Sequence, residues 1–163
     1  MSTLRLRAPI EKQPILTNHW FLRFPTELNI DSFDVASVSS PKLNADIVDI
    51  PFFSTSTYLY GRYEFDTITV TVREHANESA QQKLMNWVNL GIEVTTGRVN
   101  YAIAYKKDLA IELCDPLGLP LRRWELSGAF VQTFEPFQEL SYSDASVSMV
   151  SMTLKFDTAI LKY

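Results

Sequence analysis

The stretch Phe65-Asp-Thr-Ile-Thr-Val-Thr-Val-Arg73 gives the clearest indication of the fold class. Ile68, Val70 and Val72 fall on one side of an extended chain and the threonines on the other, because side chains alternate along a strand. One face is therefore expected in a hydrophobic core. The threonine face is polar and favours the strand conformation, as a wall with one hydrated side requires.

An α-helix is expected next, over about residues 77–90, because the apolar spacing changes there from two residues to three and four. Asn77 is the predicted N-cap, and Gly91 is the residue expected to end the helix. The apolar positions that recur at helical spacing are Ala80, Leu84, Trp87 and Val88.

Further strands are expected on both sides of this segment. The aromatic residues 18–24 and the shorter stretch 33–38 precede it. Residues 107–127 alternate around the turn Asp115-Pro-Leu-Gly118 and predict a hairpin, because proline presets its own φ and glycine supplies the unusual conformation. Gly128 is expected to close this hairpin, and residues 146–157 to form the last long strand.

The predicted fold class is mainly β (α+β): a β-sandwich or barrel with one inserted α-helix, in a single domain over residues 1–163. Residues 129–145, with Pro136, are expected to be irregular. Long strands with one polar face have edges that must be capped or paired with other chains. The predicted core consists of Phe21, Ile68, Val70, Val72, Leu84, Trp87, Val88, Ile111, Leu154 and Phe156.

Residues 41–64 have an unusual composition, with two prolines, Phe52-Phe53 and three tyrosines but no strict alternation. They are too aromatic for a hydrated loop, which favours an extended arm or hairpin that contacts another subunit. A long loop packed on its own domain is the alternative. Residues 1–14 carry Pro9 and Pro14 and are expected to form an N-terminal arm.

The composition argues against several functions. A net charge of -4 with scattered Lys and Arg disfavours tight nucleic-acid binding. One cysteine, Cys114, excludes an intrachain disulfide, and we expect it on a polar strand face as an unremarkable thiol. No segment approaches the roughly 18 uninterrupted apolar residues of a membrane-spanning helix, so no membrane insertion by this chain is expected.

Catalytic, cofactor-binding and metal-binding residues are not identified in the sequence. It contains two histidines, and it lacks CxxC, HxxxH, GxSxG, GxGxxG and P-loop motifs. Carboxylate pairs such as Asp46 with Asp49 are interpreted as hydrated surface. The sequence therefore predicts a protein that is not an enzyme and that needs no cofactor.

The order of these features resembles the tail tube proteins of contractile-tailed bacteriophages, a superfamily that includes the type VI secretion ring protein. The resemblance covers roughly residues 18–160. The pieces that carry it are Asn18–Phe24, the arm over 41–63, Tyr63-Glu-Phe-Asp-Thr-Ile-Thr-Val-Thr-Val72, Lys83-Leu-Met-Asn-Trp87, Lys107–Gly118, Trp124-Glu-Leu-Ser-Gly128 and Leu154-Lys-Phe-Asp157.

This resemblance implies a homo-hexameric ring whose sheets join across subunits around a channel, with rings stacked into a tube inside a contractile sheath. The implied partners are the tail sheath protein, baseplate hub or initiator proteins, and a tape-measure protein and genomic DNA that occupy the lumen without specific binding. The implied location is the virion tail, assembled in the host bacterial cytoplasm. The expected anchors of the inter-subunit arm are Phe52, Phe53, Tyr58 and Tyr60.

Two alternatives stay open on the sequence. One is a related tube component: a baseplate initiator or terminator, or the tube protein of a contractile bacteriocin or type VI-like injection system. The other is a monomeric β-barrel module that binds carbohydrate or peptide. The polar faces of 65–73 and 147–157 are both candidates for lining a lumen, and an acidic chain suits a lumen that repels phosphate.

Overall fold

A computed structural model describes residues 13–163, in which strands dominate and two short α-helices are inserted. The strands are β1 (Trp20–Arg23), β2 (Val35–Val38), β3 (Leu43–Phe52), β4 (Thr55–Phe65), β5 (Ile68–Arg73), β6 (Ile92–Glu93), β7 (Arg98–Val99), β8 (Lys107–Cys114), β9 (Pro120–Glu135), β10 (Met149–Lys155) and β11 (Thr158–Leu161). The helices are α1 (Ala80–Gly91) and α2 (Ala102–Tyr105), with 3-10 turns η1 (Thr26–Leu28) and η2 (Ser32–Asp34). The mainly β class with an inserted helix is confirmed. The N-terminal arm expected over 1–14 lies outside the described residues, except for its last two.

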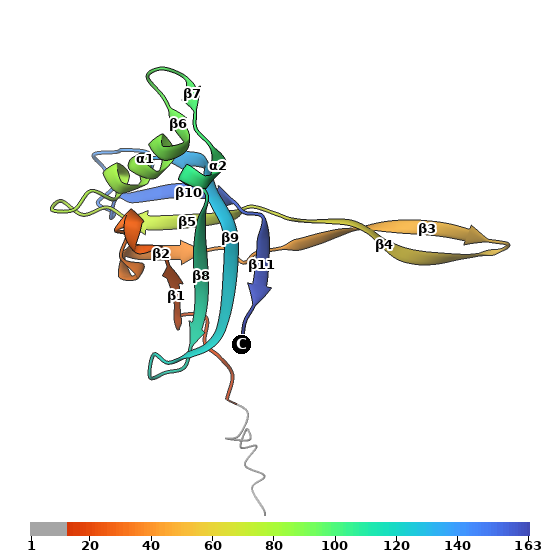
Figure 1. Ribbon diagram of the computed structural model, residues 1–163. Helices are drawn as coiled ribbons and strands as arrows, with labels where there is room; N and C mark the ends of the chain where they lie inside the picture. Colours follow the sequence, from red (N-terminus) through yellow and green to blue (C-terminus); the bar gives the residue numbers. More distant parts are fainter. Residues whose placement is uncertain (1–12) are drawn as a thin grey trace, which may run out of the picture.

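The main sheet has seven strands in the order β1-β8-β9-β10-β5-β2, with β11 paired to β9. The long strand β9 pairs with β8 and β11 through its first part and with β10 through its second part. It thereby joins two layers that enclose the core (Figure 1). Within the described chain β1 and β2 lie at the two ends of the strand order and do not pair with each other. The sheet is therefore open, and these residues do not form the closed barrel that the sequence left as an alternative to a sandwich.

The course of β9 differs from the sequence prediction. Gly128 does not close a hairpin but lies inside the strand, where three residue steps along β9, from Leu126 to Ala129, oppose two steps along β8, from Lys107 to Leu109. This one-residue bulge places Gly128 at φ 68°, a conformation that glycine adopts without strain. Residues 130–135, expected to be irregular, therefore continue as strand and pair with β10.

Helix α1 begins later than its sequence pattern indicated. Ser79, not Asn77, is the N-cap, and its hydroxyl accepts a 3.2 Å hydrogen bond from the backbone N–H of Gln82. The Glu74 carboxylate accepts a 3.0 Å hydrogen bond from the backbone N–H of Gln81, the residue before Gln82. Both bonds satisfy donors that the first helical turn leaves open. Gly91 is the last helical residue, and its missing side chain lets the Tyr105 ring approach.

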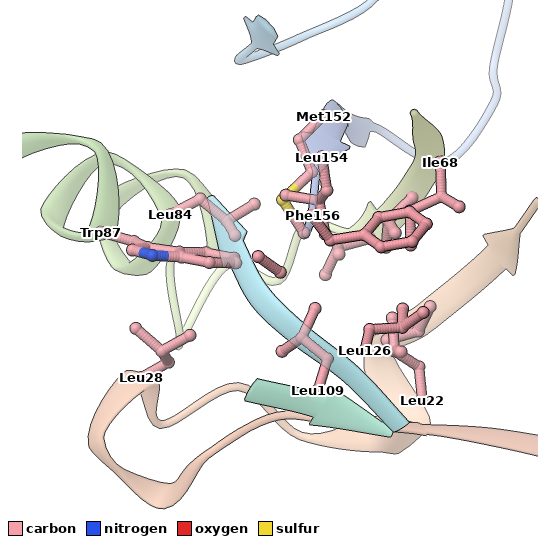
Figure 2. Close-up of a cluster of buried hydrophobic side chains, with 14 of the residues drawn as sticks. Leu22, Leu28, Ile68, Leu84, Trp87, Leu109, Leu126, Met152, Leu154 and Phe156 are labelled. Carbon is pink, nitrogen blue, oxygen red and sulfur yellow. The ribbon is translucent and has the colours of Figure 1, made fainter. Parts of the chain in front are cut away.

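The core lies between the two layers of the sheet and is closed at one end by α1. Figure 2 shows Leu84 and Trp87 of the helix pointing toward the side chains of the strands. The predicted core residues that belong to this cluster are Ile68, Val70, Val72, Leu84, Trp87, Ile111, Leu154 and Phe156. Trp87 also donates a 2.8 Å hydrogen bond from Nε1 to the carbonyl of Tyr105, which satisfies its polar atom.

Two expected core residues lie elsewhere. Leu22, fully buried, takes the place expected for Phe21, because Leu22 pairs with Ile111 on the inner face. Phe21 pairs with Glu112 on the outer face and packs edge-on against Phe33, 5.5 Å between ring centroids. Val88 is half-buried at the rim of the helix. Apolar residues occur on both sides of β1, so the sequence pattern did not determine which side of this strand faces the core.

Among the described residues, no helix has both the length and the apolar character needed to cross a membrane.

Candidate assembly surfaces

The arm predicted over 41–64 is a hairpin that projects from the body of the protein. Strands β3 and β4 pair with each other from Leu43↔Phe65 to Phe52↔Thr55 and form a two-stranded sheet separate from the main one. Every residue of β3 is exposed, as is every residue of β4 except Phe65 at its base. Figure 1 shows the hairpin extending well away from the packed layers.

The four predicted anchors all lie on this hairpin and are exposed: Phe52 by 64%, Phe53 by 96%, Tyr58 by 66% and Tyr60 by 85%. Further exposed apolar residues of the hairpin, which were not among the predicted anchors, are Ile47, Val48, Ile50, Leu59 and Tyr63. The pairing places Val48, Ile50 and Phe52 on one face, together with Leu59. The short local alternation of Val48, Ile50 and Phe52 with Asp49 and Pro51 was a signal for two of these neighbours, Val48 and Ile50.

The tip of the hairpin, residues 50–57, reads Ile-Pro-Phe-Phe-Ser-Thr-Ser-Thr and carries no charge. The Phe52 and Phe53 rings pack edge-to-face with centroids 5.1 Å apart. Phe53 has φ 52°, in the left-handed region that bulky residues rarely adopt. The Thr55 hydroxyl donates to the carbonyl of Phe52 at 3.1 Å and helps to close the turn.

An apolar groove of about 570 Å³ lies where β1 and β8 face β2 without pairing to it. We call it the mouth groove. It is lined by Thr17, Trp20, Ala36, Ser37, Val38, Ser39, Ser40, Pro41, Ile111, Leu113 and Trp124, all uncharged. Because the layers separate here, Trp20 and Trp124 contact the core on one side and remain half-exposed on the other.

A second apolar surface surrounds the β6–β7 hairpin next to α1. Ile92, Val94 and Val99 are exposed there, as are Tyr101, the N-cap of α2, and Ile103 within α2. A smaller groove of about 260 Å³ opens beside them, between Trp87, Tyr105 and Phe130. This surface and the mouth groove are both lined by apolar side chains that the fold leaves without a partner.

On the outer face of the sheet, a charge cluster surrounds the buried side chain of Glu112. The Glu112 carboxylate accepts hydrogen bonds from Arg23 Nε at 2.9 Å and Arg123 Nη1 at 2.8 Å, which joins β1, β8 and β9. Arg123 also approaches Glu125, at 3.4 Å. Each charge is paired, so the cluster serves to stabilise the sheet rather than to bind an anion.

Two titratable side chains outside this cluster have shifted pKa values. Cys114, expected on a polar face, is buried, because both faces of β8 are covered near its end, and burial raises the pKa of its thiol. On the surface, a hydrogen bond from Lys83 lowers the pKa of Glu78. Among residues 13–163, no three His, Cys, Asp or Glu side chains are grouped so that they could hold a metal ion.

The two polar faces considered for a lumen form one surface. Strand pairing places Thr69 opposite Thr153 and Thr71 opposite Ser151. Their neighbours Val70, Val72, Val150 and Met152 point the other way, into the core. The polar faces of β5 and β10 therefore lie side by side on the outer side of the same layer.

Comparison with known proteins gives matches to a family and to solved structures. The model of the family described as T4-like virus tail tube protein gp19 matches residues 34–159. The anti-feeding prophage tube terminating cap is similar with a TM-score of 0.75 and 17% identity, over 99% of each chain. The sheath/tube terminator of an extracellular contractile injection system, PVC, is similar with a TM-score of 0.74 and 18% identity, over 93% of this chain and 99% of that chain.

The sheath-tube complex of the same PVC system contains a chain similar with a TM-score of 0.72 and 19% identity, over 91% of both chains. At such identities these structures establish the shared fold. No curated protein matches the sequence.

Proposed function

The chain belongs to the family of T4-like virus tail tube proteins, and from that premise we propose that it is the repeating subunit of a tail tube. It is a structural component of the contractile tail tube type. In the proposal, copies form hexameric rings, the rings stack into a tube, and a contractile sheath surrounds the tube. The chain has no catalytic role in this assembly.

The observation that carries this proposal is the projecting hairpin β3–β4. It exposes Phe52, Phe53, Tyr58 and Tyr60 together with aliphatic neighbours, far from the core of its own subunit. A contiguous exposed apolar surface of this kind is typical of a protein–protein interface. A bridging arm between neighbouring subunits accounts for it.

Free sheet edges support the same proposal. In the described residues, β1 and β2 end the strand order of the main sheet, and β11 pairs on one side with β9. Unpaired edges promote pairing with other chains unless they are protected. Joining edges across subunits of a ring satisfies these backbone groups and encloses a central channel.

The proposed channel conducts DNA during ejection without binding it specifically. The net charge of -4 disfavours adhesion of phosphate groups. The joined polar face of β5 and β10, rich in serine and threonine, is the candidate lining. A tape-measure protein occupies the lumen before DNA, and baseplate hub or initiator proteins start the tube. Assembly takes place in the host bacterial cytoplasm.

The test is negative-stain electron microscopy of the purified protein over a range of concentrations, alongside sedimentation velocity. Six-fold hollow rings that stack into tubes are the expected result. Isolated rings that never stack indicate a tube initiator or terminator instead. A monomer that stays monomeric at high concentration, and also with purified baseplates as seeds, contradicts the proposal and favours a binding module.

A further inference from the structure

The hairpin tip and the mouth groove are complementary surfaces of the same chain. Charged residues make up 21% of the sequence, yet residues 50–57 of the tip and all the lining residues of the groove are uncharged. We infer that the Phe52–Phe53 tip of one copy docks into the mouth groove of a second copy. This inference rests on the proposed tube function and names the contact that joins its subunits.

The tip cannot reach the groove of its own subunit. The groove wall includes Ser39, Ser40 and Pro41, which are separated from β3 by one residue, Lys42. Strand β3 has 10 residues, and a strand rises about 3.3 Å per residue, so the tip lies roughly 30 Å from this wall. Figure 1 shows the hairpin directed away from the sheet that carries the groove. The occupant must therefore come from another molecule.

The conformation of Phe53 indicates a partner for its ring. A bulky residue with φ 52° is strained, and a ring that is 96% exposed gains nothing from its own fold. Glycine or asparagine would adopt this turn at lower free energy. An aromatic anchor at the apex is explained when its side chain becomes buried in an interface, where buried aromatic residues carry much of the binding energy.

The mouth groove suits this occupant better than the groove beside β6–β7. Its volume is about 570 Å³, against about 260 Å³ for the second groove. Two phenyl rings packed edge-to-face, 5.1 Å between centroids, need the larger space. Trp20 and Trp124 on its walls offer aromatic faces for further edge-to-face contacts.

The contact joins two different surfaces of the chain, the tip and the groove. Repeated head to tail it is heterologous and builds a closed ring or an open helical array. Formed in both directions between the same two copies it would give a two-fold dimer, so a tube requires the tip and the groove of each subunit to engage different neighbours.

Disulfide trapping tests the contact in assembled protein. Ser54→Cys places a thiol beside Phe53, and Ser37→Cys places one in the mouth groove, both by near-isosteric changes. Oxidation of the S54C/S37C protein in tubes should give covalent oligomers in a ladder. The matched control is S54C/T95C, with Thr95 on the exposed turn of β6–β7. Each single variant reports background linkage, including linkage to buried Cys114.

The outcomes separate this inference from the proposed function. Tubes that cross-link through S54C/T95C, or through neither pair, overturn the docking site while the tube function stands. Absence of tubes in every variant and in the unmodified protein overturns the function, and the docking site with it. A ladder specific to S54C/S37C supports both.

Removal of the anchor gives an independent measurement. Phe53→Ala should raise the critical concentration for assembly at least about tenfold, the effect of losing an interface hot spot. Phe137→Ala, at an exposed phenylalanine on the β9–β10 connection, is the control and should change it less than about twofold. Phe53→Gly should impair assembly equally while leaving thermal unfolding of the monomer unchanged or improved. Normal assembly of both Phe53 variants contradicts the inference.

Discussion

At the scale of single residues, Glu112 is a charged side chain that tertiary contacts bury. Its place in an alternating strand predicts a hydrated side chain, yet it is 5% exposed. Arg23 reaches it from β1 and Arg123 from β9, so three strands share one carboxylate. The charge stabilises the sheet because both guanidinium groups compensate for its burial.

We expect Glu112→Ala to lower the free energy of unfolding by about 2–3 kcal/mol, since two charge-assisted hydrogen bonds are lost. Glu112→Gln keeps an acceptor and should cost less. Chemical denaturation of both variants measures the effect. An equal and negligible loss in both would mean that the arginines are satisfied by water and that the cluster adds little.

Gly128 is a residue whose role depends on its neighbour Asp157. A methyl group at Gly128 would lie 2.2 Å from Asp157 Oδ2 in the present geometry, and the backbone has φ 68°. Asp157 is also the carboxylate that pairs with Lys106, at 2.8 Å. Substitution therefore strains the backbone and displaces an ion pair.

Gly128→Ala should destabilise the protein by about 1–3 kcal/mol, from the left-handed backbone and the displaced Asp157. Gly97→Ala is the matched control, because Gly97 has φ 71° and nothing within 4 Å of the added Cβ. Thermal melts of the two variants should differ, with G128A lower. Equal melting temperatures would show that Asp157 moves aside without cost.

At the scale of elements, the hairpin β3–β4 and the body of the protein have separate roles. The hairpin makes its own ladder and contributes no residue to the buried core cluster. Half-buried Phe65 at its base packs against Phe156, with centroids 5.5 Å apart. The body should therefore fold without the rest of the hairpin.

Replacement of residues 45–60 by a short turn should change the unfolding free energy by less than about 1 kcal/mol, as for surface changes away from the core. It should abolish tube formation, which sedimentation and electron microscopy can follow. Tubes of normal length, or an unfolded product, would each contradict the role given to the arm.

At the scale of the whole molecule, the proposed assembly depends on apolar contacts more than on charge. The hairpin tip and the mouth groove are uncharged, and the half-exposed tryptophans of the groove have free apolar surface. Excluded salts such as sulfate strengthen the burial of apolar surface, whereas sodium chloride mainly screens charges.

Ammonium sulfate at about 0.3 M should thus lower the critical concentration for tube formation. Sodium chloride at matched ionic strength should change it less, because few of the proposed contacts are ion pairs. Light scattering over a concentration series gives both values. Assembly that sodium chloride weakens strongly would indicate an interface held by charges.

The sequence by itself determined the elements with a strong period: the alternation of β5, the helical spacing of α1 and the turn at Asp115–Gly118. These are local properties, since side-chain direction follows from backbone geometry over a few residues. The family resemblance rested on their order along the chain. The unusual composition of 41–64 also indicated the arm.

The tertiary structure alone decided which residues face the core where the local pattern was ambiguous. Leu22 rather than Phe21 is buried because β1 pairs with β8 in one register, set by residues far along the chain. Gly128 lies within β9 because β8 and β10 both pair with that strand. The mouth groove arises where β1 and β2 approach each other without pairing, which no local pattern encodes. Burial and grooves depend on partners distant in sequence, and these partners come together only in the folded chain.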